Sequence, residues 1–262
     1  MGWTRVDAPV ESRAPTGRTA AYLSDGSAAL LVDPPVRTPA LDRAVADADV
    51  RHIAVTHHHP DHVGAVAAYA RETGATVWAR RGRAASFQAA TGITPDRTFA
   101  EGTTIPAGDG VKVLDLPGHA PEHVGFATGD GVVSGDVAVA EGSVVVGAPD
   151  GDMRAYLASL RRLHARNPPR LLPGHGPTIE TPRRACGRLL VHRRRRERSV
   201  LEAVDAGART LDELVDTAYE KDLTGVRDLA LATVLAHLEK LAVEGRVRWD
   251  GAQAHPARSS RR

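Results

Sequence analysis

Cysteine is nearly absent from this chain, since Cys186 is the only one among its 262 residues. A disulfide within the chain is therefore impossible, and a zinc finger held by several thiolates is excluded. The first residues lack the apolar run of a signal peptide, and no stretch approaches the roughly 20 apolar residues that a membrane helix needs. We therefore expect a protein of the reducing cytoplasm that makes no use of a membrane.

Aromatic side chains and excess charge are also scarce. Phe, Trp and Tyr make up 4% of the residues, whereas 42% are hydrophobic and 25% charged, and the formal net charge is only +2. This composition is that of an ordinary folded protein with an aliphatic core, and it argues against disorder over most of the chain. A chain of 262 residues can form one large core, or one such core with a small domain appended.

Short strands and helices alternate over the first two thirds of the chain. Hydrophobic patterning predicts a hairpin over residues 22–32 and further short strands at 52–55, 75–79, 111–116, 123–128, 131–134 and 170–172. Helical spacing of apolar residues predicts helices at 41–48, 63–73, 81–90 and 153–166. This alternation predicts an α/β (α+β) fold for a domain over residues 1–181.

The pattern changes after Pro182, where turn signals become rare. Helices are predicted at roughly 183–206, 210–219 and 226–244. A strand and a turn follow at 246–251, and residues 254–262 are predicted to be a frayed tail. Two helices followed by a short β-ribbon are typical of a winged helix. We therefore predict that residues 182–262 hold a linker helix and a small, helical winged-helix-like domain.

The strongest chemical signal is a histidine-rich motif between a predicted strand and a predicted helix, Thr56-His57-His58-His59-Pro60-Asp61-His62. Alternate residues of an extended chain face the same way, so His57 and His59 can converge on one ion. Asp61 and His62 lie where the chain turns into the helix and can reach a second ion. Imidazole and carboxylate ligands favour zinc, iron or manganese over calcium. A histidine-rich surface loop is the alternative interpretation.

Three further motifs each place one histidine or aspartate at the end of a predicted strand: Pro117-Gly118-His119, Ser134-Gly135-Asp136 and Pro173-Gly174-His175-Gly176. Taken singly, a histidine or aspartate at a strand end usually just ends a turn. Together with the first motif they share one feature, because every candidate ligand follows a strand. Loops at one edge of stacked sheets can converge on a single cleft. The four motifs therefore predict a metal site at that edge.

These four motifs, in this order, resemble those of the metallo-β-lactamase superfamily, and the resemblance covers about residues 15–180. It implies an αββα sandwich of two mixed sheets flanked by helices. It also implies two ligand groups bridged by Asp136, namely His57, His59 and His119 for one metal and Asp61, His62 and His175 for the other. Asp33 resembles a family position that supports a metal-ligand histidine.

Two divalent metal ions held in this way are the cofactors that the resemblance implies, with zinc as the default and iron or manganese as alternatives. A water shared by two cations loses a proton easily, since one zinc already lowers its pKa from about 16 to about 7. The hydroxide would attack an ester, a thioester or a phosphodiester. Asp61 is the candidate catalytic residue, which would orient the hydroxide and pass a proton onward. We therefore expect a metal-dependent, lactamase-like hydrolase.

The substrate class stays open. Common antibiotic-cleaving β-lactamases carry cysteine where this chain has Asp136, and β-CASP nucleases carry a large insertion between the positions of Asp136 and His175 that is missing here. The C-terminal piece and residues 134–180 resemble a branch of the superfamily with an attached winged helix. That branch includes endoribonucleases that cut single-stranded RNA, acyl-carrier thioesterases of polyketide pathways, and proteins named hydroxyacylglutathione hydrolases. A small-molecule ester or thioester and single-stranded RNA are therefore the candidate substrates, and a homo-oligomer stays open.

Arginines are unevenly placed, with a dense group on the helix predicted after Pro182: Arg183, Arg184, Arg188, Arg193, Arg194, Arg195, Arg196 and Arg198. They could bind phosphates of a nucleic acid. The alternatives are a solvated helix face and pairing with acidic residues of the preceding domain. A winged-helix DNA-binding protein with an inactive lactamase domain is the non-enzyme alternative, against which the intact ligand set argues. His123 either supports the site, faces the substrate or merely lies at a strand edge.

Overall fold

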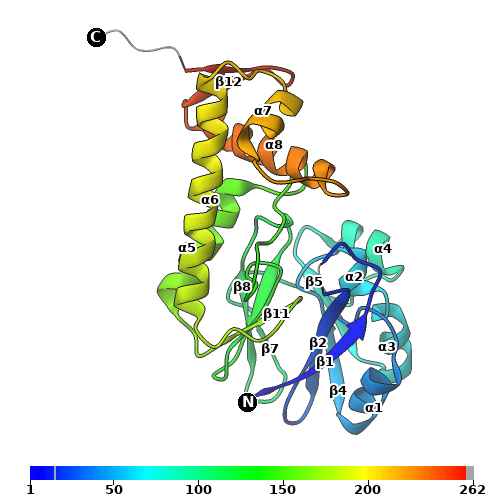
Figure 1. Ribbon diagram of the computed structural model, residues 1–262. Helices are drawn as coiled ribbons and strands as arrows, with labels where there is room; N and C mark the ends of the chain where they lie inside the picture. Colours follow the sequence, from blue (N-terminus) through cyan, green and yellow to red (C-terminus); the bar gives the residue numbers. More distant parts are fainter. Residues whose placement is uncertain (15, 258–262) are drawn as a thin grey trace.

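Two mixed β-sheets lie face to face in the computed structural model, which describes residues 1–14 and 16–257 (Figure 1). The first sheet contains, in spatial order, β1 (Trp3–Pro9), β2 (Arg18–Ser24), β3 (Ala29–Val32), β4 (Val50–Ala54), β5 (Thr76–Arg80) and β6 (Arg97–Phe99). The second contains β11 (Leu171–Pro173), β10 (Val132–Gly135), β9 (Val124–Ala127), β8 (Val111–Asp115) and β7 (Thr104–Ile105). Each sheet combines parallel and antiparallel neighbours.

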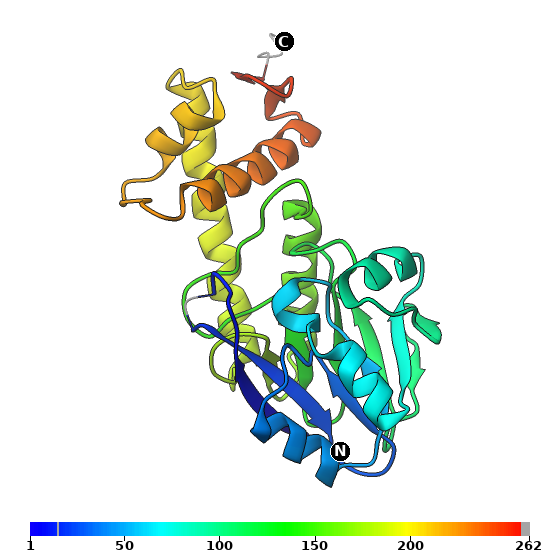
Figure 2. The same ribbon diagram turned by 90° about the vertical axis from the view of Figure 1, so that its right-hand side faces the viewer.

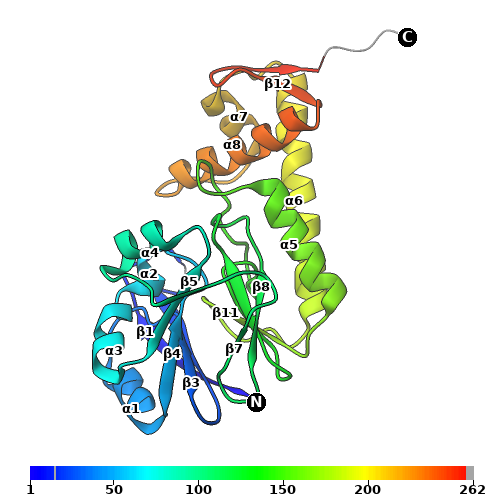
Figure 3. The same ribbon diagram turned by 180° about the vertical axis from the view of Figure 1, so that it is seen from behind.

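Helices cover the outer face of each sheet (Figures 1 and 3). The helices on the first sheet are α1 (Pro39–Asp47), α2 (Pro60–Val63), α3 (Val66–Thr73) and α4 (Ala84–Thr91). Those on the second sheet are α5 (Met153–Arg166) and the first part of α6 (Pro182–Asp205). The αββα sandwich that the motifs imply is confirmed.

Strand β3 has an apolar sequence throughout because both of its faces are buried. Successive side chains of a strand point to opposite faces. Leu30 and Val32 therefore pack between the two sheets, whereas Ala29 and Leu31 pack beneath the outer helices. Because both faces of the sheet are covered, this strand shows an uninterrupted apolar run instead of an alternation of polar and apolar residues.

The helix predicted over 63–73 is the main correction within the sandwich. It consists of two pieces, α2 and α3, because the backbone N–H of Ala65 donates to the carbonyl of Pro34 at 3.0 Å instead of extending α2. The chain therefore changes direction directly after His62. Strands β1, β6 and β7 were also not predicted. All three lie at sheet edges, where β1 buries little beyond Trp3 and Ala8 and the other two are very short.

The C-terminal region contains α7 (Leu211–Ala218), α8 (Arg227–Val243) and the antiparallel pair β12 (Val247–Trp249) and β13 (Ala254–Pro256). This arrangement confirms the predicted winged-helix-like region. The frayed tail predicted from residue 254 is wrong at its start, because β13 pairs with β12 and Ala254 donates to the carbonyl of Arg209 at 2.8 Å. Residues 258–262 of that tail lie outside the described residues.

Helix α6 belongs to both cores. Cys186 and Leu189 pack with α5 against the second sheet, whereas Val200 and Val204 pack with α7 and α8. The predicted boundary between residues 181 and 182 stays a prediction, since one continuous helix of 24 residues spans both parts. No helix in the described residues combines the length and apolar character needed to cross a bilayer. The cellular compartment stays a prediction.

Candidate metal centre

The structure brings all seven predicted ligand side chains together. They form three overlapping groups whose candidate ligand atoms lie within 4.8 Å of one another: His57, His59 and His119; His57, His62 and Asp136; and Asp61, His62 and His175. The first and third groups are the two ligand sets that the resemblance implies. Each motif follows the end of a strand, namely β4, β8, β10 and β11. The geometry therefore fits the prediction, while coordination itself stays a prediction.

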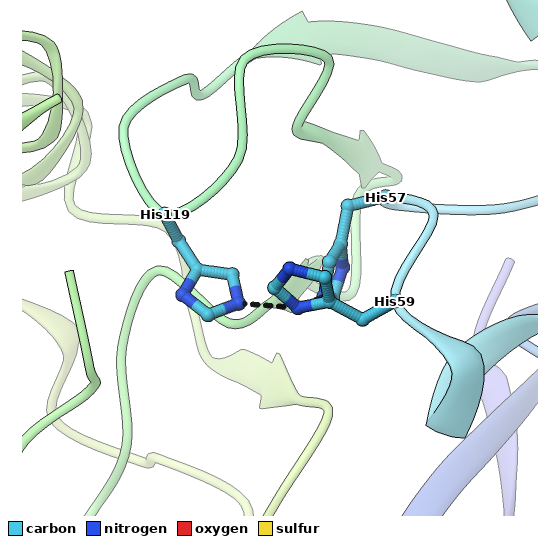
Figure 4. A group of neighbouring side chains, drawn as sticks. All are labelled: His57, His59 and His119. Atoms are coloured by element: carbon cyan, nitrogen blue, oxygen red, sulfur yellow. Dashed lines mark hydrogen bonds between the residues drawn. The ribbon is translucent and has the colours of Figure 1, made fainter. Parts of the chain in front are cut away.

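The first group joins loops from the two sheets. His57 and His59 follow β4 of the first sheet, and His119 follows β8 of the second (Figure 4). The Nδ1 atom of His59 lies 3.0 Å from Nε2 of His57 and 2.9 Å from Nε2 of His119. Three ring nitrogens that face one another in this way are a donor set suited to zinc or a similar cation.

Asp136 lies between the two ligand sets. One of its carboxylate oxygens is 3.7 Å from His62 Nε2, and the other is 3.7 Å from His119 Nε2 and 3.3 Å from His175 Nε2. On the far side, His175 Nε2 also lies 3.4 Å from Asp61 Oδ2. This arrangement is the one that a bridging carboxylate between two cations requires.

Four of the five candidate histidines have Nδ1 beside an oxygen acceptor. The pairs are His57 with Thr56 Oγ1 at 3.0 Å, His62 with Asp33 Oδ2 at 3.0 Å, His119 with the Val145 carbonyl at 2.7 Å, and His175 with the Arg18 carbonyl at 2.8 Å. A carbonyl or carboxylate can only accept, so Nδ1 carries the proton in His62, His119 and His175. Nε2 is thereby the nitrogen that faces the centre, and in the neutral ring its lone pair is available to a metal ion.

Asp33 makes the contact predicted for it with a candidate ligand histidine. Its carboxylate is fully buried and accepts from the Thr56 backbone N–H at 2.6 Å and from the Thr56 hydroxyl at 2.7 Å, as well as from His62. Because the Thr56 hydroxyl donates to Asp33, its oxygen is left to accept from His57. One carboxylate thus orients two histidines from different ligand groups.

The donor set fits a pair of cations. His62 Nε2 and Asp136 Oδ1 are buried and have no hydrogen-bond partner among the described residues. A buried polar atom without a partner costs free energy, which a bound cation would offset. The backbone also leaves the centre clear, because a Cβ atom on Gly174 would lie 2.5 Å from Asp136 Oδ1 and 2.6 Å from His62 Cε1. Glycine is therefore required at this point of the fourth motif.

The carboxylates hold positive charge in the centre. Burial disfavours a charged His175, but its hydrogen bonds to Asp136 and Asp61 outweigh that effect and raise its pKa to about 11. Burial would likewise raise the pKa of Asp136, yet the charge of His62 and the hydrogen bond from His175 hold it well below its usual range. In the metal-free protein a proton on His175 balances the acids. A bound cation would replace that proton.

Two residues around the centre have roles that sequence reasoning left open or missed. His123 is fully buried, stacks on His57 with ring centroids 5.0 Å apart, and accepts from the Asp136 backbone N–H at 3.0 Å, so it supports the centre from behind. Glu122 accepts from the His58 backbone N–H at 3.0 Å and thereby fixes the first motif. Nothing in its local sequence pattern signals that contact.

Comparison with known families decides the classification. A profile described as metallo-beta-lactamase superfamily matches residues 14–175, well over half of the chain. The chain belongs to this superfamily. A second profile, described as beta-lactamase associated winged helix domain, matches residues 210–254. With its His and Asp cluster in place, this member of the metallo-beta-lactamase superfamily is a metallo-hydrolase.

Relatives cover both parts of the chain. A beta-lactamase-like protein 2 homolog of Drosophila melanogaster is 30% identical over 77% of this chain and 71% of its own. A probable metallo-hydrolase of Bacillus subtilis is 26% identical over 90% of this chain and 92% of its own. An atrochrysone carboxyl ACP thioesterase of Aspergillus fumigatus is 27% identical over 91% of this chain and 81% of its own.

Solved structures support the fold. A metallo-beta-lactamase family protein from Thermus thermophilus superposes with a TM-score of 0.79 at 24% identity, over 97% of this chain and 98% of that one. At that identity the likeness shows the fold alone. The protein TTHA1623, solved in a di-iron-bound form, is 33% identical with a TM-score of 0.52, over 66% of this chain and 94% of its own.

Proposed function

We propose that this metallo-hydrolase cleaves a carboxylic thioester or ester, with Asp61 as the side chain that accepts and passes on a proton. The observation that carries the proposal is the position of the Asp61 carboxylate. It belongs to the second ligand group, yet its side chain is 17% exposed whereas that of Asp136 is 10% exposed. Asp61 is therefore the acid of the centre that a substrate can approach more readily.

The charge state of Asp61 suits this role. Burial would raise its pKa, but the hydrogen bond with His175 and the charge of His62 outweigh burial and lower it. The carboxylate is therefore anionic at neutral pH and can accept a proton from an attacking water and deliver it to a leaving thiolate or alkoxide. When bound, a pair of divalent cations supplies Lewis acidity and makes a water easier to deprotonate.

An uncharged carbonyl suits the centre better than a phosphodiester. Among the described residues, Asp61 and Asp136 form ion pairs with histidines only. Arginine and lysine are the side chains that usually meet the charge of a phosphate. Two arginines of α6, Arg188 and Arg193, instead donate to backbone carbonyls of the sandwich. The similarity to an acyl-carrier thioesterase over both parts of the chain also supports a thioester.

Cleavage of single-stranded RNA is the second candidate, and one surface feature favours it. A hollow of about 370 Å³ lies between α6 and the end of α7 and is lined by His192, Arg195, Arg196, Ser199, Ala218, Glu220 and Lys221. Arg196 already donates to the Ala218 carbonyl, but Arg195 and Lys221 are exposed. Their positive charges are suited to the backbone of a nucleic acid.

Parallel assays separate the two candidates. Protein purified without chelator is analysed for zinc, iron and manganese, with zinc as the expected metal, and is then tested on an acyl-glutathione thioester, an acyl-pantetheine thioester and a single-stranded RNA oligonucleotide. Thioester turnover that Asp136→Ala abolishes is the expected result. RNA cleavage abolished by the same variant selects the nuclease instead. Bound metal with neither activity contradicts both substrate classes, and protein unable to bind metal contradicts the metal centre itself.

A further inference from the structure

One metal-site histidine depends on a segment that the sequence motifs do not include. Residues 139–148, here called the strap, lie in the connection between β10 and α5. In Figure 2 this green segment rises from the sandwich to α8 of the C-terminal region. The carbonyl of Val145, in the strap, accepts the 2.7 Å hydrogen bond from His119 Nδ1. The orientation of the His119 ring therefore depends on where the strap lies.

The first part of α6, which packs on the second sheet, holds the strap from one side through Arg188. This exposed guanidinium donates to three strap carbonyls, those of Val139 at 2.8 Å, Ala140 at 3.1 Å and Gly142 at 2.5 Å. A guanidinium has five N–H donors in a fixed plane, so it can tie several carbonyls at once.

Two further contacts fix the middle and the end of the strap. Arg193, one turn and a half further along α6, donates to the carbonyl of Val144. At the far end, the backbone N–H of Ala148 donates to the carbonyl of Ala232 in α8 at 3.2 Å. The Val144 carbonyl, directly before Val145, is thus hydrogen-bonded to α6, and Ala148, three residues after Val145, is hydrogen-bonded to α8.

Arg193 is unusual because it stands in the apolar stripe of its helix. Arg193 is only 3% exposed and lies between Leu189 and Val200 on the buried face of α6. Its Nε has no hydrogen-bond partner among the described residues, and no carboxylate there forms an ion pair with it. Burying a charge without an acid partner is costly, and an apolar side chain of similar size would fill this space at lower cost.

The surroundings of Arg193 connect it to the metal centre twice. Its guanidinium lies over the ring of Tyr156, 5.5 Å from the ring centroid. The Tyr156 hydroxyl donates at 2.9 Å to the carbonyl of Val137, the residue directly after Asp136. Arg193 therefore contacts the segment that follows Asp136 at two points, directly at Val144 and through Tyr156 at Val137.

We propose that Arg193 is a positioning residue for the metal centre, which holds the Val144 carbonyl so that the adjacent Val145 carbonyl meets His119 Nδ1 and directs His119 Nε2 at the cation. This inference rests on the proposed ligand role of His119. It makes α6, the helix shared by both cores, a structural part of the first ligand group, in addition to any contact that the C-terminal region makes with substrate.

Metal titration tests the proposal without relying on activity. Apoprotein is titrated with Co²⁺ and with Zn²⁺ against a chromophoric chelator, for the parent, Arg193→Met, Arg193→Lys and Arg194→Met. Arg194 is the matched control because it is the next arginine of the same run and is exposed. We expect Arg193→Met to weaken the binding of one ion by about 10- to 100-fold and to change the Co²⁺ absorption spectrum of that ion. Arg193→Lys, which keeps a donor, recovers part of the affinity, and Arg194→Met matches the parent.

Each other outcome has a distinct meaning. A folded Arg193→Met protein that binds both ions with parental affinity and spectrum overturns the proposal, as does an equal loss in Arg194→Met. A parent that takes up no metal contradicts the proposed metal centre instead. If Arg193→Met does not fold, Arg193→Lys provides the test, because it keeps the charge but loses the planar guanidinium that reaches the Val144 carbonyl. A severalfold loss of affinity for one ion relative to the parent is then expected, and unchanged binding overturns the proposal.

Discussion

Two fully buried histidines, one in each region of the molecule, show opposite behaviour. His62 of the sandwich and His237 of α8 are both 0% exposed. Burial lowers the pKa of each. For His62 the carboxylates of Asp136 and Asp33 outweigh burial and raise its pKa, whereas Arg193 and Lys240 add to burial and lower the pKa of His237 to about 3. The partners of these two buried histidines, and not their burial, therefore set the direction in which the pKa of each is shifted.

The same contrast extends to the surroundings. The sandwich gathers buried carboxylates around its histidines, so its centre is arranged to hold positive charge. In the C-terminal region the nearest acid to His237, Glu197 at 3.9 Å, already pairs with Lys240 at 2.7 Å and Arg246 at 3.0 Å. Glu197 is thus already paired with two cationic side chains and does not offset a charge on His237.

Replacing Asp136, the proposed bridging acid, should have the largest effect on metal binding and hydrolysis. Asp136→Ala removes the carboxylate shared by both ligand groups, so we expect loss of both cations and a fall in hydrolysis by roughly a thousandfold or more. Metal content of the purified variant and its turnover of the best substrate are measured together. Asp212→Ala is the control, because that acid forms an exposed ion pair in the C-terminal region. A variant that keeps two ions would show that Asp136 bridges nothing.

Asp61→Asn should separate rate from metal binding. Since the amide keeps the shape but cannot accept a proton, we expect turnover to fall by about 10²- to 10⁴-fold while metal content changes little. The measurements are turnover at saturating metal and the ion stoichiometry. An equal loss of both would mean that Asp61 acts only as a ligand.

Asp33→Asn tests the carboxylate that orients His62, a kind of partner that His237 lacks. The amide cannot accept all three hydrogen bonds that Asp33 now receives, so the His62 ring loses its fixed orientation. We expect metal affinity to weaken by about 10- to 100-fold, with activity regained at high metal concentration. Asp49→Asn, at an exposed acid, serves as control. Unchanged metal affinity would mean that Asp33 does not determine the orientation of the His62 ring.

His237→Phe should give the smallest effect, confined to acid pH. The folded protein holds His237 with a pKa of about 3, whereas the unfolded chain has a pKa of about 6.5. The unfolded state therefore binds more protons, and stability is complete above about pH 6.5 and declines as the pH falls toward 3. At pH 5 this one residue costs about 2 kcal/mol. Urea unfolding at pH 7 and pH 5 should show a smaller pH-dependent loss in the variant than in the parent, and an equal loss would contradict the assignment.

The seven candidate ligands could be predicted because their chemistry is local. Each motif couples a strand end to a histidine or an aspartate, and the topology brings those ends together. The support of His119 could not be predicted, since a backbone carbonyl such as that of Val145 leaves no mark in the sequence. Arg193 did leave one, because it occupies a buried position of helical spacing, but its place within an arginine run suggested phosphate binding instead.

The edges of the fold were predicted least well. Interior strands such as β3 and β10 are apolar on both faces, so their pattern is strong. Strand β1 carries Arg5 and Asp7 and is buried mainly at its ends, so no pattern separates it from a loop. The winged-helix region was predicted from its order of elements, yet β13 was missed because its three residues resemble a polar tail.

The ligands divide unevenly between the two sheets. Four of them, from His57 to His62, follow β4 of the first sheet, whereas His119, Asp136 and His175 follow strands of the second. A partly folded chain in which only one sheet has formed contains one part of this ligand set and cannot complete the metal site. Metal uptake during refolding would consequently report the moment at which the two sheets dock, later than the appearance of secondary structure.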